Sequence, residues 1–184
     1  MTQKEYHIES TDGKKLFIRY WHPENRAKAI MFMLHGFSEH SGRYIHWAEK
    51  FVREKIVVCA MDYRGHGHAE GIKGHTPSYN QLLDDIKSGL SHIENINNLP
   101  VILYGQSLGG NLVLSYGLFR ENSLSGIIST SPWLRLVTRP KTFTILLGRI
   151  LRKVAPARMR DSKLNINLLS HNPQVAVDYE KDPL

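Results

Sequence analysis

Three unbroken apolar runs constrain the fold of this 184-residue chain more than any other feature. The runs cover residues 29–34, 56–61 and 101–104, so each has the length of a β-strand. Because none of them alternates apolar with polar residues, each is expected to be buried on both faces. Segments 44–52 and 79–93 separate the runs and carry apolar residues at helical spacing. This alternation predicts an α/β fold, a mostly parallel sheet with helices on both faces.

A change of pattern divides the chain into two parts. Residues 1–131 hold the predicted sheet, which begins with a hairpin turned at Asp12-Gly13. Residues 132–184 contain no strand-like apolar run, but they do contain an amphipathic helix over 143–154. We therefore predict an α/β core over 1–131 and a helical insertion over 132–184.

The positive charge of the chain is concentrated in its last quarter. The formal net charge is +7, and residues 132–184 hold 10 Lys/Arg against 4 Asp/Glu. This segment shows no nucleic-acid motif and no interleaved aromatic residues, so no nucleic-acid partner is expected.

There is no run of about 18 apolar residues, and the first ten residues are polar, so neither a membrane span nor a secretory signal is predicted. The single cysteine, Cys59, lies within a predicted strand, and we expect a cytoplasmic location.

The segment Gly105-Gln106-Ser107-Leu108-Gly109 matches the pattern G-x-S-x-G. In that pattern a sharp strand-to-helix turn holds the serine in a strained conformation and exposes its hydroxyl. The flanking glycines allow two stretches of backbone to approach closely. The pattern follows a predicted buried strand and opens an apolar helix, which is the context that the turn requires. Ser107 is therefore a candidate nucleophile, and a glycine-rich turn that only caps the helix is the alternative.

The dipeptide His35-Gly36 follows the first apolar run and is expected to lie beside this turn. The carboxyl ends of parallel strands share one edge of a sheet, and ligands bind there. The backbone N–H groups of Phe37 and Leu108 are then predicted to form an oxyanion hole, in which each donor stabilises the transition state by about 3 kcal/mol. The imidazole of His35 is expected to be buried and hydrogen-bonded to backbone.

Three segments, "HGFSEHSGRY", "MDYRGHGHAEG" and "GQSLGG", resemble in order and spacing the monoacylglycerol lipase and lysophospholipase branch of the α/β-hydrolase family, which is S33 serine aminopeptidase-like. The final segment, "LLSHNPQVAVDYEKDPL", is similar to the end of that family's lid. The resemblance implies Ser107 as the nucleophile, with the N–H groups of Phe37 and Leu108 as the oxyanion hole. It also implies a helical lid over 132–184 above an acyl-chain pocket, and no metal or cofactor.

Three positions depart from the family's pattern. Ser38 replaces a usual glycine, Gln106 replaces the usual histidine before the nucleophile, and Ala69 replaces a usual serine. None of these departures removes a catalytic group, but Ser38 and Gln106 bear on substrate preference.

The triad of this fold runs in the order Ser, then Asp or Glu, then His along the chain. After Ser107 the only histidine is His171, and the acids are Glu121, Asp161, Asp178, Glu180 and Asp182. Asp161 and His171 are one possible pair, but both fall in the lid-like segment, where no strand places them beside Ser107. The resemblance implies two further strands after the lid, followed by the acid and the histidine. We therefore expect this chain to be the N-terminal part of the fold, without its triad acid and histidine.

The function expected from these features is cleavage of carboxylic esters through an acyl-enzyme on Ser107. The resemblance implies monoacylglycerol-like or lysophospholipid-like lipids as substrates, and this chain alone is expected to be inactive or very weak. A non-catalytic relative that binds an acyl ligand or a partner is the alternative in another class. Another esterase, a thioesterase or a peptidase is the alternative within the fold.

Two surfaces are expected to make contacts outside the chain. The basic segment 132–184 could rest on an anionic membrane surface, which would make the protein peripheral there, or its apolar residues could simply pack on the core. The strand predicted near 124–130 is expected to be an unpaired sheet edge, which favours association.

Overall fold

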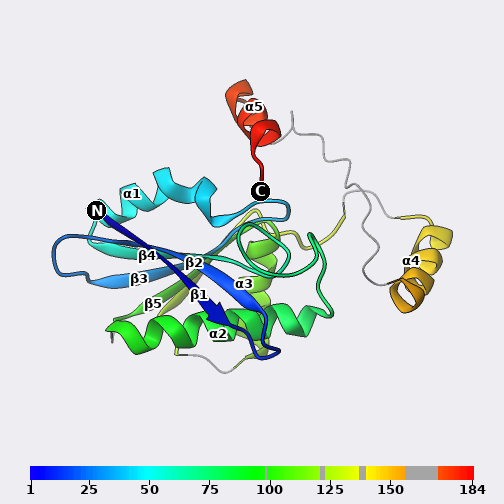
Figure 1. Cartoon of the computed structure of the whole chain (residues 1–184), viewed down its shortest axis with the longest axis horizontal. Helices are drawn as coiled ribbons and strands as arrows, with labels where there is room; N and C mark the ends of the chain where they lie inside the picture. Colours follow the sequence, from blue (N-terminus) through cyan, green and yellow to red (C-terminus); the bar gives the residue numbers. More distant parts are fainter. Residues whose placement is uncertain (98, 121–122, 137–139, 156–169) are drawn as a thin grey trace.

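A computed structural model describes all residues except 98, 121–122, 137–139 and 156–169 (Figure 1). Its centre is a six-stranded sheet in the order β1-β2-β4-β3-β5-β6. The strands are β1 Thr2–Glu9, β2 Lys15–His22, β3 Ala29–Leu34, β4 Ile56–Asp62, β5 Val101–Gln106 and β6 Gly126–Thr130.

Four of the six strands run parallel to one another. β3 pairs parallel with β4 and β5, and β5 pairs parallel with β6. β1 and β2 form an antiparallel hairpin, and β2 joins the rest of the sheet through an antiparallel pairing with β4. The hairpin turns at Asp12-Gly13 as predicted, with Gly13 at φ +79°. The prediction of a mostly parallel sheet is therefore confirmed.

Helices cover both faces of this sheet (Figure 1). They are η1 Ser41–Tyr44, α1 Ile45–Arg53, α2 Tyr79–Asn97 and α3 Leu108–Phe119. Along β3, Met31 and Met33 pack with η1 and α1, whereas Phe32 and Leu34 pack with α2 and α3. Because successive side chains of a strand point to opposite faces, the unbroken apolar run fills two cores at once.

The predicted apolar stripe of α2 is buried except at its first residue. The buried members are Leu82, Leu83, Ile86, Leu90 and Ile93. Tyr79, also expected on this stripe, is 41% exposed. Its hydroxyl lies 2.6 Å from Asn111 Oδ1 and 2.7 Å from Ser115 Oγ on α3. The prediction that Tyr79 is buried is therefore wrong, because its hydroxyl is hydrogen-bonded at the surface between the two helices.

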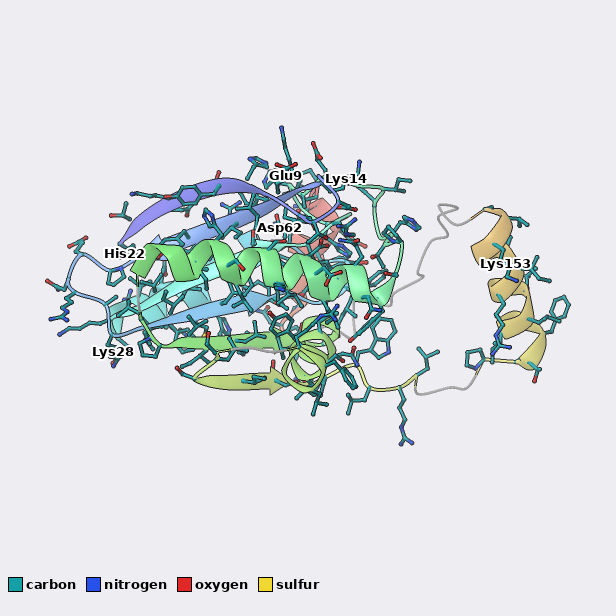
Figure 2. The ribbon with its side chains drawn as sticks, turned by 90° about the horizontal axis from the view of Figure 1, so that it is seen from below. Glu9, Lys14, His22, Lys28, Asp62 and Lys153 are labelled. Carbon is teal, nitrogen blue, oxygen red and sulfur yellow. The ribbon has the colours of Figure 1, made fainter. Side chains whose placement is uncertain are left out.

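The described part of residues 132–184 contains two helices, α4 (Thr142–Val154) and α5 (Pro173–Lys181), and no strand. α4 stands apart from the sheet in both views (Figures 1 and 2). Most of its apolar side chains are exposed, to 74% for Phe143 and 73% for Val154. The helix expected over 143–154 is thus confirmed, while the division into core and lid stays a prediction. No described helix is long and apolar enough to cross a membrane.

β6 forms one edge of the sheet within the described residues. Ile127 and Ile128 on this strand are 37% and 42% exposed. An edge strand presents unpaired backbone N–H and C=O groups, which can pair with another chain. The unpaired edge expected near 124–130 is confirmed, and association through it stays a prediction.

Arg64, in the loop after β4, is almost fully buried between two carboxylates. Its Nε and Nη2 donate to the carboxylate of Asp85 at 2.6 and 2.7 Å. Its Nη1 and Nη2 donate to the carboxylate of Asp12 at 2.8 and 3.0 Å. Asp85 on α2 is fully buried and also accepts from the hydroxyl of Ser10. These bonds connect the β1–β2 turn, the loop after β4 and α2.

We expect Arg64→Met to lower the free energy of unfolding by about 3–5 kcal/mol. The substitution leaves the buried carboxylate of Asp85 without its cation, and removing one partner of a buried pair is strongly destabilising. Urea denaturation at neutral pH measures the change.

Arg19→Met is the matched control, because Arg19 pairs at 2.8 Å with Glu5, whose exposed carboxylate stays solvated when the arginine is removed. This control is expected to cost less than about 1 kcal/mol. Equal costs for the two variants would contradict the buried ion pair as the cause.

The same ion pair makes the free energy of unfolding depend on pH. The hydrogen bond from Arg64 lowers the pKa of Asp12 to about 2. The stabilisation from Asp12 is therefore present above the ordinary pKa of 3.8 and is lost as the pH falls towards 2. Arg64→Met should reduce this loss of stability at low pH.

Candidate active site

Ser107 directly follows β5 and has a strained backbone, with φ +54° and ψ −112°. Residues other than glycine rarely adopt a positive φ. The Ser107 N–H donates to the carbonyl of Thr130 at 3.0 Å, and its own carbonyl accepts from the N–H of Trp133 at 2.9 Å. α3 begins at the next residue. The sharp strand-to-helix turn predicted from the G-x-S-x-G pattern is therefore present.

The two glycines of the pattern are required by close backbone contacts. A Cβ atom at Gly109 would lie well inside van der Waals contact with the carbonyl oxygens of Leu34 and His35. A Cβ atom at Gly105 would clash in the same way with the backbone of Gly109. The first turn of α3 therefore lies directly against the end of β3, which brings the His35-Gly36 segment beside Ser107 as predicted.

A cavity of about 400 Å³ opens beside Ser107. Its lining residues are Gly36, Phe37, Glu39, Gln106, Ser107, Ser131, Pro132, Trp133, Arg135 and Tyr179. The Ser107 hydroxyl makes no hydrogen bond to another described residue, and the side chain is half-buried. The rings of Phe37 and Trp133 lie 6.1 Å apart and give the cavity an aromatic wall. No described residue of α4 lines this cavity, and the helical lid over 132–184 that the resemblance implies stays a prediction.

The two predicted oxyanion-hole donors lie on the two segments that meet at this cavity. Phe37 lines the cavity, and Leu108 is the first residue of α3. The first N–H groups of a helix have no intrahelical acceptor and carry the positive end of its dipole. Within the described part of the chain, neither the Phe37 nor the Leu108 N–H donates a hydrogen bond. Both remain free to bind an oxyanion, and this role stays a prediction.

Glu39 fixes the loop that carries Phe37. Its Oε2 accepts from the N–H of Gly36 at 2.8 Å and from the hydroxyl of Tyr44 at 2.9 Å. Burial, together with the Glu39 carboxylate, raises the pKa of Tyr44, so the phenol stays protonated and donates. No role for Glu39 was predicted from the sequence. The available signal was a carboxylate three residues after Gly36, at a spacing that lets it reach back to the loop's backbone.

His35 is buried, as expected, and serves the structure of this loop. Its Nδ1–H donates to the carbonyl of Gly36 at 2.7 Å, and its ring stacks on Tyr63 at 4.2 Å. Burial holds its pKa well below the ordinary value, so the imidazole is neutral. Its Nε2 has no hydrogen-bond partner among the described residues and lies 3.9 Å from Asp62 Oδ1.

Of the departures from the family pattern, Gln106 lines the cavity, and Ser38 lies between two residues that line it. Ser38 has φ +58°, a conformation that suits the glycine it replaces. The amide oxygen of Gln106 and the carboxylate of Glu39 both lie next to Cα of Gly36, where they leave no room for a Cβ atom. Gln106 therefore borders the cavity directly.

No histidine lines the cavity within the described residues. His171 lies just before α5 and is exposed, while Asp161 and Glu121 fall outside the described residues. His66, which precedes Ser107 in the sequence, lies in the loop after β4. Its Nδ1 bonds to the carbonyl of Arg64, and burial lowers its pKa. No group of three or more His, Cys, Asp or Glu is placed to hold a metal ion in the described ranges. Among the residues that the structure describes, the site thus combines a candidate nucleophile and two free donors with no histidine beside them.

A mostly parallel sheet covered on both faces, with a strained serine between a strand and a helix, defines the α/β-hydrolase fold. The crystal structure of Paleococcus ferrophilus monoacylglycerol lipase matches this chain with a TM-score of 0.76 and 28% identity. The match covers 100% of this chain and 64% of that one. The profile of the family described as serine aminopeptidase, S33 matches residues 25–184. The chain therefore belongs to this family.

Two curated relatives are monoglyceride lipases. Human monoglyceride lipase is 31% identical over 185 residues, covering 97% of this chain and 59% of the relative. Monoacylglycerol lipase from Mycolicibacterium smegmatis is 27% identical over 184 residues, covering 100% of this chain and 65% of the relative. The resemblance to the monoacylglycerol lipase branch is confirmed. The chain spans about two thirds or less of the length of these relatives.

We expect Gly109→Ala to lower the free energy of unfolding by about 1–3 kcal/mol. The added methyl group would clash with two carbonyl oxygens at the end of β3, which cannot move without disturbing the sheet. Urea denaturation measures the change. Gly126→Ala in β6 is the control, because a Cβ atom there meets nothing within 4 Å. A Gly109→Ala variant as stable as the control would contradict the close contact.

Proposed function

We propose that Ser107 is the nucleophile of a carboxylic ester hydrolase. The observation that carries this proposal is the strained turn, which leaves the Ser107 hydroxyl without a hydrogen-bond partner among the described residues beside the cavity. Backbone strain of this kind costs roughly 1–3 kcal/mol and clusters at functional sites. Membership of the S33 family and the likeness to monoglyceride lipases support the same chemistry.

The proposed reaction is acyl transfer to Ser107 followed by hydrolysis. The Ser107 oxygen attacks the ester carbonyl carbon, and the resulting oxyanion accepts hydrogen bonds from the N–H groups of Phe37 and Leu108. The carbon–oxygen bond to the alcohol then breaks, the leaving alcohol takes up the proton that the Ser107 hydroxyl has lost, and the acyl group stays on Ser107. Water attacks this acyl-enzyme and releases the carboxylic acid. No electron transfer is involved.

We propose monoacylglycerol-like or lysophospholipid-like lipids as the substrates. Phe37, Pro132 and Trp133 offer apolar surface for an acyl chain, and a cavity of about 400 Å³ lies within the range of small-molecule sites. The names of the relatives support a lipid ester. Other esters, thioesters and peptides are the alternative substrates of the same fold.

We further propose that the triad acid and histidine are not supplied by the described residues of this chain. This part of the proposal is supported by the lining of the cavity, which includes no histidine within the described ranges. A serine without its base retains only about 10³–10⁴-fold catalysis over water, from the oxyanion hole and binding. The 184-residue chain is therefore expected to be a weak catalyst.

An esterase assay with a short-chain nitrophenyl ester tests this function. The chain is expected to give slow hydrolysis that falls to background in Ser107→Ala and is unchanged in His171→Ala. Hydrolysis that survives Ser107→Ala would rule out Ser107 as the nucleophile. Turnover of about 10 s⁻¹, a typical value for an enzyme, that vanished only with Ser107→Ala would show that a base had been overlooked.

A second candidate function is non-catalytic binding of an acyl ligand or a partner. The absence of a histidine among the described lining residues favours it. In the same assay this function gives no Ser107-dependent hydrolysis, while a fatty acid still binds to both the wild type and Ser107→Ala.

We propose that α4 brings the protein to an anionic membrane surface. The exposed apolar side chains of α4 include Phe143, Leu146, Leu147, Ile150 and Val154. Arg149 and Lys153 on the same helix are exposed and basic. A helix with apolar and basic faces lies in the interface of a bilayer, and each basic residue near anionic lipid adds about 1 kcal/mol. We propose that the protein is cytoplasmic and binds peripherally to a membrane.

Co-sedimentation with vesicles tests this contact. The double substitution of Arg149 and Lys153 by Gln should weaken binding to vesicles containing phosphatidylserine by about tenfold or more, since two charges are worth about 2 kcal/mol. The matched control replaces Lys50 and Arg53, two exposed basic residues of α1, by Gln and should leave binding unchanged. Binding that does not depend on anionic lipid or on salt would contradict the electrostatic contact.

A further inference from the structure

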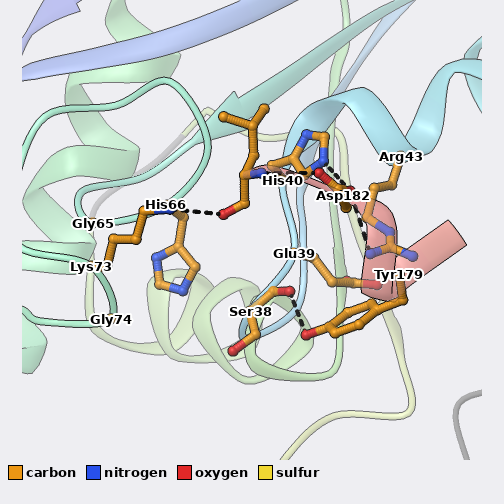
Figure 3. A pocket seen from close by; sticks show the side chains of 11 residues that line it. Ser38, Glu39, His40, Arg43, Gly65, His66, Lys73, Gly74, Tyr179 and Asp182 are labelled. Atoms are coloured by element: carbon orange, nitrogen blue, oxygen red, sulfur yellow. Dashed lines mark hydrogen bonds and ion pairs between the residues drawn. The ribbon is translucent and has the colours of Figure 1, made fainter. Parts of the chain in front are cut away.

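The last residues of the chain return to the loop that follows β3. Figure 3 shows Tyr179 on α5 and Asp182 just after it facing Ser38, His40 and Arg43. More than 130 residues of sequence separate the two sides of this contact. We call Tyr179 and Asp182 together the tail clamp.

Tyr179 makes two of the contacts. Its hydroxyl donates to the carbonyl of Ser38 at 2.8 Å. The guanidinium of Arg43 lies over its ring, 4.5 Å from the centroid, in cation–π geometry. Tyr179 also lines the cavity beside Ser107. One side chain thus touches the loop backbone and borders the candidate active site.

Asp182 makes the remaining contacts of the clamp. Its Oδ2 accepts from His40 Nε2 at 2.8 Å and lies 3.6 Å from Arg43 Nη1. The N–H of Gly42 donates to His40 Nδ1, so Nε2 carries the proton that Asp182 accepts. Burial acts to raise the pKa of Asp182, but the hydrogen bonds from His40 and the Leu184 N–H and the charge of Arg43 lower it overall, so the side chain is a carboxylate.

α5 has no buried residue of its own. Its apolar residues Val175 and Ala176 are only half-buried, so the polar contacts of the clamp are a main part of its described attachment. A contact of this type fixes position and orientation with little burial. The clamp is thus suited to setting the geometry of what it touches.

The clamp holds the backbone of the loop after β3, which carries Phe37. Ser38 lies between Phe37 and Glu39, and both neighbours line the cavity. Its backbone is at φ +58°, a left-handed conformation that is unfavourable for a residue other than glycine. Glu39 fixes the loop from within through Gly36, and Tyr179 fixes it from outside through Ser38.

We infer that Tyr179 and Asp182 are positioning residues that set the orientation of the Phe37 N–H at the site of Ser107. The inference rests on the proposed function, which assigns that N–H to the oxyanion hole. The consequence for the site is that its oxyanion donor depends on a segment at the far end of the sequence. Neither residue touches the reacting atoms, and both act through the loop.

Hydrogen exchange and amide NMR of the 184-residue chain test the clamp. Asp182→Asn and Tyr179→Phe are each expected to speed exchange at residues 36–42 by at least fivefold and to shift the Phe37 amide resonance. Asp178→Asn is the matched control. Asp178 is an exposed acid of α5 that bonds only to Gln174 on its own helix among the described residues, so the loop should stay at wild-type values. Amides of β4 report whether each variant remains folded.

Two results would overturn the inference. Faster exchange in α5 with an unchanged Phe37 amide would mean that the clamp only attaches the helix. Wild-type exchange in both segments would mean that the contacts hold neither. The esterase assay does not enter this test, so a failure of the proposed hydrolase activity and a failure of the clamp are observed separately. Tyr179→Phe keeps the ring over Arg43 and removes only the bond to Ser38, which isolates the effect of the hydroxyl.

Discussion

The contact between Gly109 and the end of β3 is the constraint on which the rest of the site depends. It presses the start of α3 against the carbonyl groups of Leu34 and His35, so that no side chain fits between them. The turn that joins β5 to α3 must then be sharp, and Ser107 takes up the strain. The same contact places the beginning of a helix, with its free N–H groups, next to the loop after β3. Steric exclusion in the backbone thus determines where the chemistry can occur.

The loop after β3 is held on all sides by polar groups that belong to different parts of the fold. Glu39 accepts a hydrogen bond from the N–H of Gly36 within the loop. Tyr63, the residue after β4, donates to the carbonyl of Gly36 at 3.1 Å. The buried carboxylate of Asp62 accepts the N–H of Ser41 at the other end of the loop. An irregular loop beside a cavity needs such partners, because its backbone groups are not satisfied by a sheet or a helix. Preorganised donors also require no rearrangement during a reaction.

Most of the fold could be predicted from the sequence because burial leaves a periodic signature. The apolar runs became β3, β4 and β5, and the helical spacings became α1 and α2. The turn at Ser107 was also predictable, since its glycines mark a contact that only glycine permits. Contacts between polar side chains far apart in sequence leave no such pattern. The roles of Glu39 and Tyr179 were therefore missed, and the exposed position of α4 could not be read from an apolar stripe that suits either a core or a membrane.

The conformation of Ser107 has a consequence for protein engineering. A residue held at φ +54° destabilises the folded state, and glycine would adopt the same backbone at lower cost. Variants of this chain selected only for resistance to heat would therefore tend to lose the serine hydroxyl. A directed-evolution campaign on this protein would need to screen for the proposed ester hydrolysis and for thermal endurance together, because at the proposed nucleophile the two criteria favour different amino acids.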